Sequence, residues 1–196
     1  MTPHTTADGR TLLVRAAVGA DARAVSAQID EVAGERDVPL LATPGSISLR
    51  DVRTLISKSA RDPRGAFFVA ELDGEIAGNL GGSGLSFAPS AHVFEFGMSV
   101  GAAYRGLGVG SALLETLLAW AAEAGFAKVV LSAFPHNERA IAFYERHGFT
   151  YEGRRARQFH REDRYYDELL MGRWIGLSEG SPDGSPRPAV LPSDGG

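Results

Sequence analysis

The chain has 196 residues, of which 44% are hydrophobic and 22% are charged, a composition typical of one soluble globular domain. It contains no cysteine, which excludes disulfides, a thiolate nucleophile and cysteine-based zinc sites. The formal net charge of −4 argues against a general nucleic-acid binder, and the lack of an apolar run of about 18 residues argues against a membrane span.

The N-terminal part of the chain is predicted to hold one strand and two helices. Residues 1–10 are polar and are expected to form a flexible terminus without the apolar core of a signal peptide. A strand is expected over residues 11–17, followed by a helix that Asp21 can cap. After a proline-containing loop over residues 35–47, Ser48 with an acidic residue three positions later opens the second helix.

A hairpin is predicted next. The apolar runs Ala66–Leu72 and Glu75–Leu80 are joined by an Asp-Gly pair, which is a strong signal for a tight turn between antiparallel strands. The glycine-rich segment Gly81–Gly84 is expected to belong to the link that leads to the next strand, Val93–Val100.

A glycine-rich turn follows that strand and leads into a helix predicted over residues 110–124. Gly106, Gly108 and Gly110 occur at every second position, so no Cβ atom keeps a ligand away from the backbone there. The unpaired N–H groups and the dipole of the following helix favour a phosphate group. Arg105 adds a guanidinium, which is a good donor to phosphate oxygens.

The spacing of these glycines distinguishes between the folds that use such a turn. It does not fit the G-x-G-x-x-G dinucleotide fingerprint, and no lysine follows the glycines as a P-loop requires. It does fit R-x-x-G-x-G, with Arg105, Gly108 and Gly110, which resembles the coenzyme A pyrophosphate loop of the GCN5-related N-acetyltransferases (GNAT). Taken alone, the loop could also be a tight turn without a ligand.

Two further segments carry the same resemblance. After a strand expected over residues 128–134, the segment Asn137–Phe149 resembles the family pattern N-x-x-A-x-x-x-Y-x-x-x-G-F. The segment Tyr166–Met171 is similar to the closing strand of many members that act on small substrates. The resemblance covers about residues 11–174.

The resemblance implies an α/β (α+β) GNAT fold. Such a fold has a mixed, mostly antiparallel sheet of six to seven strands and about four helices, and its parallel fourth and fifth strands splay apart. Here those strands are residues 93–100 and 128–134. The acetyltransferase domain is expected over residues 11–176, followed by a Gly/Pro/Ser-rich tail over residues 177–196 that is expected to be disordered.

The resemblance also implies acetyl-CoA (coenzyme A) as co-substrate, with no metal. The pantetheine arm would enter the gap between the splayed strands, and an N–H near Met98 or Val100 would polarise the thioester carbonyl. The expected cofactor-binding residues are Met98, Ser99, Val100, Arg105, Gly106, Leu107, Gly108, Val109, Gly110, Ser111, Asn137 and Tyr144. Ser111 and Asn137 could instead be simple helix caps.

Two residues are predicted to be catalytic. Tyr144 corresponds to the tyrosine that donates to the sulfur in many members of the family; the alternative is a core tyrosine on an amphipathic helix. Glu95 is the predicted base, and partial burial beside Phe94 and Phe96 would raise its pKa towards neutral pH. The alternative for Glu95 is a solvated or substrate-binding carboxylate.

Together these features predict an acyl-CoA-dependent N-acyltransferase that passes acetyl to a primary amine by direct attack in a ternary complex. A small-molecule acceptor is favoured over a protein, and loops 35–48 and 81–91 are expected to line its site. The alternatives are a non-catalytic coenzyme A-binding sensor, a protein N-terminal or lysine acetyltransferase, and a nucleotide-binding domain. We expect no nucleic-acid or membrane partner and a cytoplasmic location, and the resemblance allows a homodimer.

Overall fold

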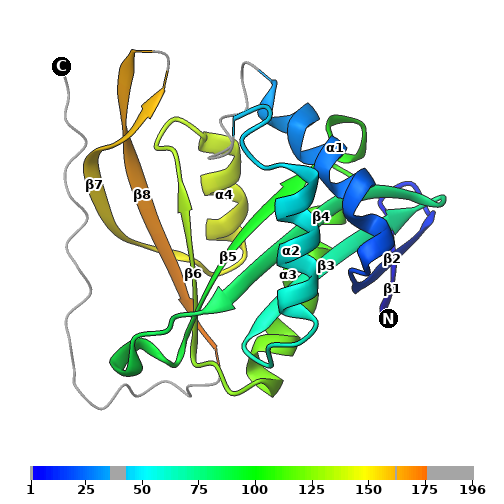
Figure 1. The fold of residues 1–196 in the computed structure, drawn as a ribbon, viewed down its shortest axis with the longest axis horizontal. Coiled ribbons are helices and arrows are strands. Elements are labelled where there is room, and N and C mark those ends of the chain that lie inside the picture. Colours follow the sequence, from blue (N-terminus) through cyan, green and yellow to red (C-terminus); the bar gives the residue numbers. More distant parts are fainter. Residues whose placement is uncertain (1, 36–42, 162, 176–196) are drawn as a thin grey trace.

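The computed structural model describes residues 2–35, 43–161 and 163–175; the tail predicted to be disordered lies outside them. Within these residues the chain forms one eight-stranded sheet with the order β1-β2-β3-β4-β5-β6-β8-β7 (Figure 1). The strands are β1 (Thr2–Thr5), β2 (Thr11–Ala16), β3 (Gly65–Leu72), β4 (Glu75–Gly84), β5 (Val93–Val100), β6 (Lys128–Ala133), β7 (Thr150–Arg161) and β8 (Arg164–Trp174). The α-helices are α1 (Ala22–Ala33), α2 (Leu49–Ser59), α3 (Val109–Glu123) and α4 (Glu138–Arg146). None of the described helices is long and apolar enough to cross a membrane.

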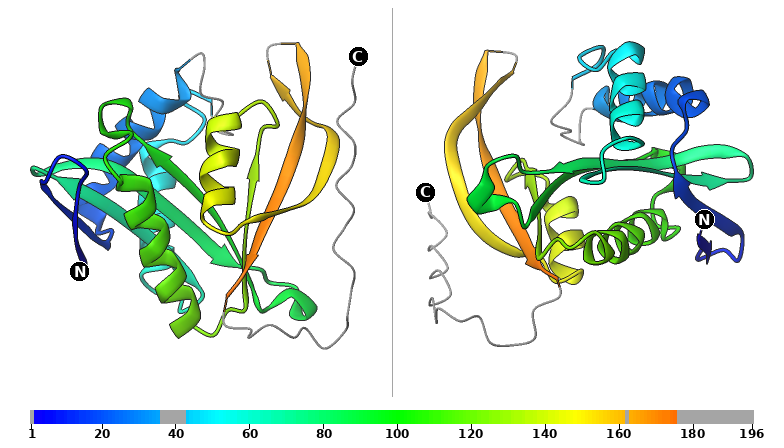
Figure 2. Two further views of the ribbon diagram at one scale, coloured as in Figure 1. Left: turned by 180° about the vertical axis from the view of Figure 1, so that it is seen from behind. Right: turned by 60° about the horizontal axis from the view of Figure 1, so that its bottom comes forward.

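Helices cover both faces of the sheet. Helices α1 and α2 lie on one face and α3 and α4 on the other (Figure 2). Strand β3 shows the consequence in its sequence: Phe67 and Val69 pack against α1 and α2, whereas Phe68 and Ala70 belong to the core under α3. A strand buried on both faces reads as a continuous apolar run rather than an alternating one.

Strand β4 is longer than the sequence indicated. The segment Gly81–Gly84, expected to be part of a link, continues the strand and pairs with β5. Its glycines are required by packing, because a Cβ on Gly81 would lie 2.6 Å from the ring of Phe67 and one on Gly82 would overlap the carbonyl oxygen of Glu95. These glycines therefore mark places where neighbouring strands of the sheet approach closely, and they do not form a turn.

The parallel pair of strands is joined at one end only. Strands β5 and β6 pair at three positions, Val93 with Lys128, Phe94 with Val129 and Glu95 with Val130. Beyond these positions both strands continue, but they diverge towards the top of Figure 1. The splay expected for the fourth and fifth strands is thus present, and the far edge of β5 beyond Glu95 has no strand partner among the described residues.

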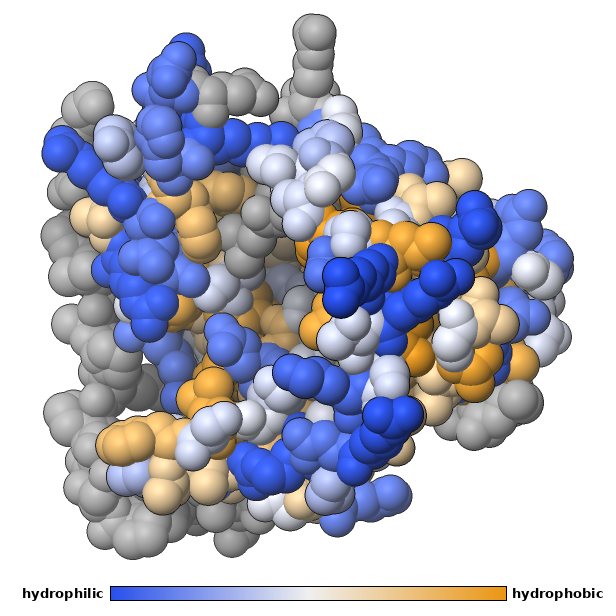
Figure 3. Space-filling model, in the orientation of Figure 1, coloured by the Kyte–Doolittle hydropathy of each residue, from blue (hydrophilic) through white to orange (hydrophobic). Residues whose placement is uncertain are grey.

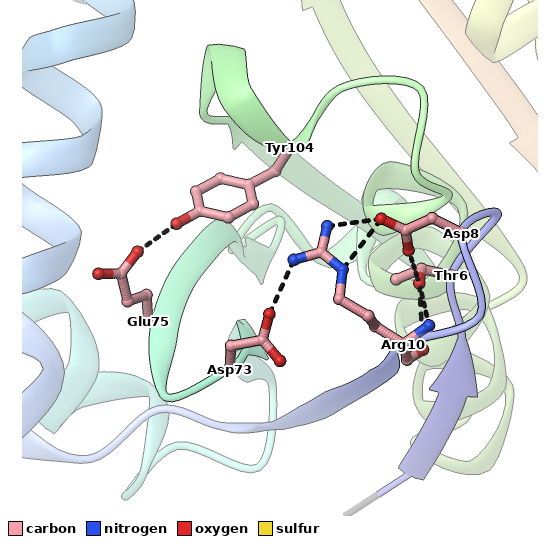
Figure 4. Close-up of polar contacts among 6 residues, drawn as sticks. All are labelled: Thr6, Asp8, Arg10, Asp73, Glu75 and Tyr104. Carbon is pink, nitrogen blue, oxygen red and sulfur yellow. Dashed lines mark hydrogen bonds and ion pairs between the residues drawn. The ribbon is translucent and has the colours of Figure 1, made fainter.

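The N-terminal segment, expected to be flexible, contains a strand over residues 2–5 that pairs antiparallel with β2. The turn after it is held by polar side chains (Figure 4). Arg10 donates to Asp8 and to Asp73 in the β3–β4 turn, both at 2.7 Å. The Arg10 and Thr6 hydrogen bonds lower the pKa of the Asp8 carboxyl to about 2. Polar residues of this segment therefore hold its turn together and bind it to the β3–β4 turn.

Asp21 does not cap α1 through its side chain. A single 3-10 turn over Gly19–Asp21 precedes the helix, so the carboxylate reaches back to the backbone N–H of Val18 at 2.8 Å. It also forms a two-oxygen pair with Arg15, at 2.7 and 2.9 Å. This ion pair and hydrogen bonding lower the pKa of Asp21. Ser48, in contrast, caps α2 as the sequence predicts.

Candidate active site

The glycine-rich turn has the backbone that the sequence predicted for an anion cradle. Gly106 and Gly108 have φ angles of +79° and +91°, a region that only glycine adopts readily. Gly108 is the N-cap of α3, and a Cβ at either glycine would meet no atom within 4 Å. The turn therefore presents bare backbone to open space at the positive end of a helix.

A cavity of about 440 Å³, here called the loop cavity, lies beside this turn. Its lining includes eleven of the twelve residues predicted to bind the cofactor: Met98, Ser99, Val100, Arg105, Gly106, Gly108, Val109, Gly110, Ser111, Asn137 and Tyr144. The exception is Leu107, which packs against the core and whose carbonyl accepts the N–H of Ala7 at 3.2 Å. That bond ties the glycine-rich turn to the N-terminal segment.

Four residues of α4 join the lining although they were not predicted to bind the cofactor: Arg139, Ala140, Phe143 and Arg146. Arg139, Phe143 and Arg146 follow at intervals of four and three residues, which places them on one face of the helix. That spacing, with two cations on the face that carries Phe143, is the signal that could have identified them.

The guanidinium of Arg105 is bound within the chain. It forms a two-pronged pair with Glu35, at 2.6 and 2.7 Å, and its Nε donates to the carbonyl of Val100 at 3.1 Å. Arg105 thus joins the start of the glycine-rich turn to the end of α1, with further N–H groups left over for an anion. Its role towards phosphate stays a prediction.

Ser111 contacts a histidine at the end of α4. His147 lies with Nε2 at 3.1 Å from the Ser111 hydroxyl and Nδ1 at 2.8 Å from the carbonyl of Phe143. Its ring packs against Phe143, with centroids 4.3 Å apart. His147 therefore fixes the end of α4 against the first turn of α3.

A second cavity, of about 640 Å³, lies on the face of the sheet that carries α1 and α2 and is here called the sheet cavity. Figure 3 shows the hollow between α2 and the strands β7 and β8. Its walls include apolar side chains of α1 and α2 (Ile29 and Leu55) and of the loop before α2 (Ile47), glycines of β4 and β5 (Gly81 and Gly97) and the end of β6 (Ser132 and Ala133). Of the loops expected to line the acceptor site, Ile47, Gly81–Gly84 and Ser86 do so, and residues 36–42 lie outside the described ranges.

The two cavities meet where β5 and β6 diverge. Five residues line both of them: Met98, Ser99, Asn137, Ala140 and Tyr144. A molecule held at the glycine-rich turn could therefore reach a second molecule in the sheet cavity beside Tyr144. Asn137 also caps α4, since its side-chain oxygen accepts the N–H of Ala140 at 3.2 Å.

Tyr144 is buried, but its hydroxyl forms no hydrogen bond within the described residues. Its side chain is 7% exposed and its ring packs edge-on against Phe96 and Phe149. Burial raises the pKa of the phenol, so it stays protonated at neutral and moderately alkaline pH. Among the described residues nothing accepts or donates a hydrogen bond at this hydroxyl. It is thus an available proton donor at the junction of the cavities.

Glu95 differs from its expected environment. It alternates with the buried Phe94 and Phe96 as predicted, but it is exposed rather than partly buried. It is also not part of the sheet cavity's lining, although Ser83, its register partner on β4, is. The reason is its position at the paired end of β5, before the strands diverge.

A buried polar cluster that the sequence analysis missed supports β5 at the junction. Asn79 donates to Ser99 at 3.0 Å and to Gln28, and Ser99 donates to Gln28 at 2.9 Å. All three side chains are buried. Gln28 lies on the same stripe of α1 as Val25 and Val32, and a polar residue on an apolar stripe was the available signal.

Comparisons with known proteins agree with this geometry. Residues 37–149, more than half of the chain, match the model of the acetyltransferase (GNAT) family. A probable N-acetyltransferase family 8 member 5 from Mus musculus is 30% identical over 122 residues, which are 61% of this chain and 49% of that protein. The chain thus spans about half the length of the curated relatives it matches.

Two solved structures show the same fold. A GNAT-family acetyltransferase from Streptococcus pneumoniae superposes with a TM-score of 0.75 at 28% identity, covering 84% of this chain and 99% of that one. A putative acetyltransferase from Salmonella typhimurium, solved with its cofactor acetyl-CoA, gives a TM-score of 0.75 at 19% identity over 89% of this chain and 99% of its own. With its splayed parallel strands, its glycine cradle and its family match, this chain belongs to the acetyltransferase (GNAT) family.

Proposed function

We propose that this protein transfers the acetyl group of acetyl-CoA to the primary amine of a small molecule, by direct attack in a ternary complex. The observation that carries the proposal is the junction of the two cavities at Tyr144. It provides a place for a thioester on one side, an amine on the other, and an acid between them. No cysteine is present to carry an acyl group, which favours direct transfer.

The loop cavity suits coenzyme A. Its glycines leave room that a Cβ would fill, and Arg139 and Arg146 add positive charge next to the helix N-terminus. The edge of β5 beyond Glu95, which has no strand partner in the described part of the chain, can bind an extended, amide-containing arm as an added strand would bind. Acetyl-CoA would supply the reactive thioester there.

The chain's own groups can meet the demands of the reaction. A backbone N–H near Met98 or Val100 would stabilise negative charge on the thioester oxygen. The Tyr144 hydroxyl would donate its proton to the departing thiolate. The role of base predicted for Glu95 stays a prediction: Glu95 is exposed, and if it took the proton of the amine through water, Glu95→Gln would lower kcat about tenfold or more.

A small acceptor is supported by the size of the sheet cavity, which at about 640 Å³ lies within the usual range for small-molecule sites, roughly 300–1,000 Å³. Ile29, Ile47 and Leu55 give the cavity an apolar wall beside Lys58 and Asp62, so we expect an amine with an apolar body. A cytoplasmic location and a homodimer stay predictions.

The test is a panel of amines, incubated with acetyl-CoA and the full chain, with release of free coenzyme A measured as thiol. Amine-dependent release, with the acetylated amine identified by mass spectrometry, is expected. Calorimetric binding of coenzyme A without release for any small amine or peptide would instead support a non-catalytic coenzyme A-binding module. Binding of NAD in place of coenzyme A would contradict the proposal.

A further inference from the structure

A buried carboxylate, that of Glu168, lies behind the β6 wall of the sheet cavity. Glu168 of β8 is 5% exposed, and its two oxygens have different partners. Oε1 accepts the hydroxyl of Ser132 at 2.6 Å, and Oε2 accepts Arg155 at 2.9 Å. A buried carboxylate that is hydrogen-bonded to a cavity-lining hydroxyl is a group with which acid–base chemistry can be done.

Ser132 stands inside the splay. It lies on β6 two residues beyond Val130, the last residue paired with β5, and it lines the sheet cavity together with Tyr144. Continuing the register of the pair would set Ser132 across the gap from Gly97. A Cβ on Gly97 would meet nothing within 4 Å, so the space in front of Ser132 is open to an acceptor.

The bond to Glu168 determines what Ser132 offers to that space. A serine hydroxyl has one proton and two lone pairs, and here the proton points to Glu168. The Ser132 oxygen therefore faces the cavity as a hydrogen-bond acceptor. An amine or ammonium N–H is the partner that such an oxygen binds.

We propose that Ser132 binds the N–H of the acceptor amine and that Glu168, acting through Ser132, receives the proton which the amine loses. The inference rests on the proposed function. The nitrogen forms a bond to the acetyl carbon, its N–H proton passes to the Ser132 oxygen, and the Ser132 hydroxyl proton passes to Glu168. The carboxylate becomes a carboxylic acid, and the C–S bond breaks as the sulfur takes a proton from Tyr144.

Glu168 is the carboxylate that contacts Ser132, and several other charged groups lie near it. Arg155 of β7 holds its other oxygen, but that guanidinium is 57% exposed, so water screens its charge. On β6 and β7, Lys128 is paired with Glu152, and Asp167 on β8 is paired with Arg154. The sheet cavity is also lined by Tyr144 and, on the α2 side, by Lys58 and Asp62.

The proposal is tested on the full chain with the best amine from the panel. Glu168→Gln keeps an oxygen that can accept the Ser132 hydroxyl but cannot store a proton as a neutral acid. We expect kcat to fall about 10²-fold and the KM for the amine to change less than about threefold. The pH at which kcat declines on the acid side of its pH profile should also change. Ser132→Ala should lower kcat and raise this KM, and Ser132→Thr should restore most of both.

Asp167→Asn is the matched control, because it removes the neighbouring carboxylate of the same strand and should leave kcat and its pH profile unchanged. Thermal unfolding of each variant confirms that it is folded. Wild-type turnover with unchanged kcat in Glu168→Gln, or with a raised KM alone, would overturn the proton step while leaving the proposed function intact. Absence of wild-type turnover would overturn both.

Discussion

At the scale of single residues, Tyr144 belongs both to the hydrophobic core and to the lining of the two cavities. Its ring packs against Phe96 and Phe149 in the core, and the residue lies where the two cavities meet. Of the two interpretations of this residue from the sequence, the core position is observed, and the role as proton donor stays a prediction.

Replacing Tyr144 by Phe should lower kcat by about 10²-fold with little change in coenzyme A affinity, because the ring stays and only the proton donor is lost. The thermal midpoint should change little, since the described part of the chain gives this hydroxyl no hydrogen bond to lose. Steady-state kinetics and calorimetry measure the two effects. An unchanged kcat would remove Tyr144 from the role of acid.

Gly97 offers a second test at this scale. It lies on β5 where the strands diverge, and space is open above it. Gly97→Val should raise the KM for the amine or abolish transfer by filling the sheet cavity, while the protein stays folded and still binds coenzyme A. Gly97→Ala, with less added volume, should have a smaller effect. Equal activity of all three proteins would show that the acceptor does not occupy this space.

At the scale of elements, α3 has a left-handed glycine at each end. Gly108 precedes it with φ +91° and Gly125 follows it with φ +82°, and a Cβ at either position would meet nothing within 4 Å. The two glycines share one backbone requirement, but only Gly108 lines the loop cavity. Their comparison separates the cost of backbone strain from the cost to ligand binding.

Gly108→Leu and Gly125→Leu should each reduce the free energy of unfolding by about 1–2 kcal/mol, because a side chain disfavours positive φ. Only Gly108→Leu should weaken coenzyme A binding, by about tenfold or more, since its side chain would enter the loop cavity. Chemical denaturation and calorimetry give the two quantities. Equal coenzyme A affinity of the two variants would contradict the cradle.

At the scale of the whole molecule, one ion network joins three elements on the α1 side of the sheet. Arg15 of β2 donates to Asp21 before α1 and to Glu71 of β3, with Arg15 to Glu71 distances of 3.0 and 3.2 Å. The Arg15 and Asp21 side chains are only 19% and 10% exposed. Two charges so far removed from water depend on each other.

Asp21→Asn should reduce the free energy of unfolding at pH 7 by about 1–3 kcal/mol, because Arg15 loses a charged acceptor. The folded-state pKa of Asp21 lies below its usual value near 4. Its contribution is therefore complete above about pH 4 and is lost as the pH falls through the lowered folded-state value. Urea unfolding at pH 7 and at pH 3 should show the gap between wild type and variant shrinking at the lower pH. A gap that is the same at both would contradict the ion pair.

The sequence by itself determined the features that depend on near neighbours. The Asp73-Gly74 turn, the Ser48 and Asn137 caps, and the glycine-rich turn before α3 are all where the sequence places them. Each depends on the backbone preferences of a few consecutive residues, and these are the same in a short peptide as in the folded chain. The two motifs in order were enough to identify the family and most of the loop cavity.

The tertiary structure decided which residues from distant parts of the chain meet. The parallel register of β5 and β6 ends at Glu95, which leaves that carboxylate in water and Ser132 inside the splay, 36 residues before its partner Glu168. Arg105 with Glu35 and Ala7 with Leu107 are two further pairs that come from distant parts of the chain. These pairs depend on strand order, register and the packing of helices on the sheet, and no local pattern in the sequence encodes them.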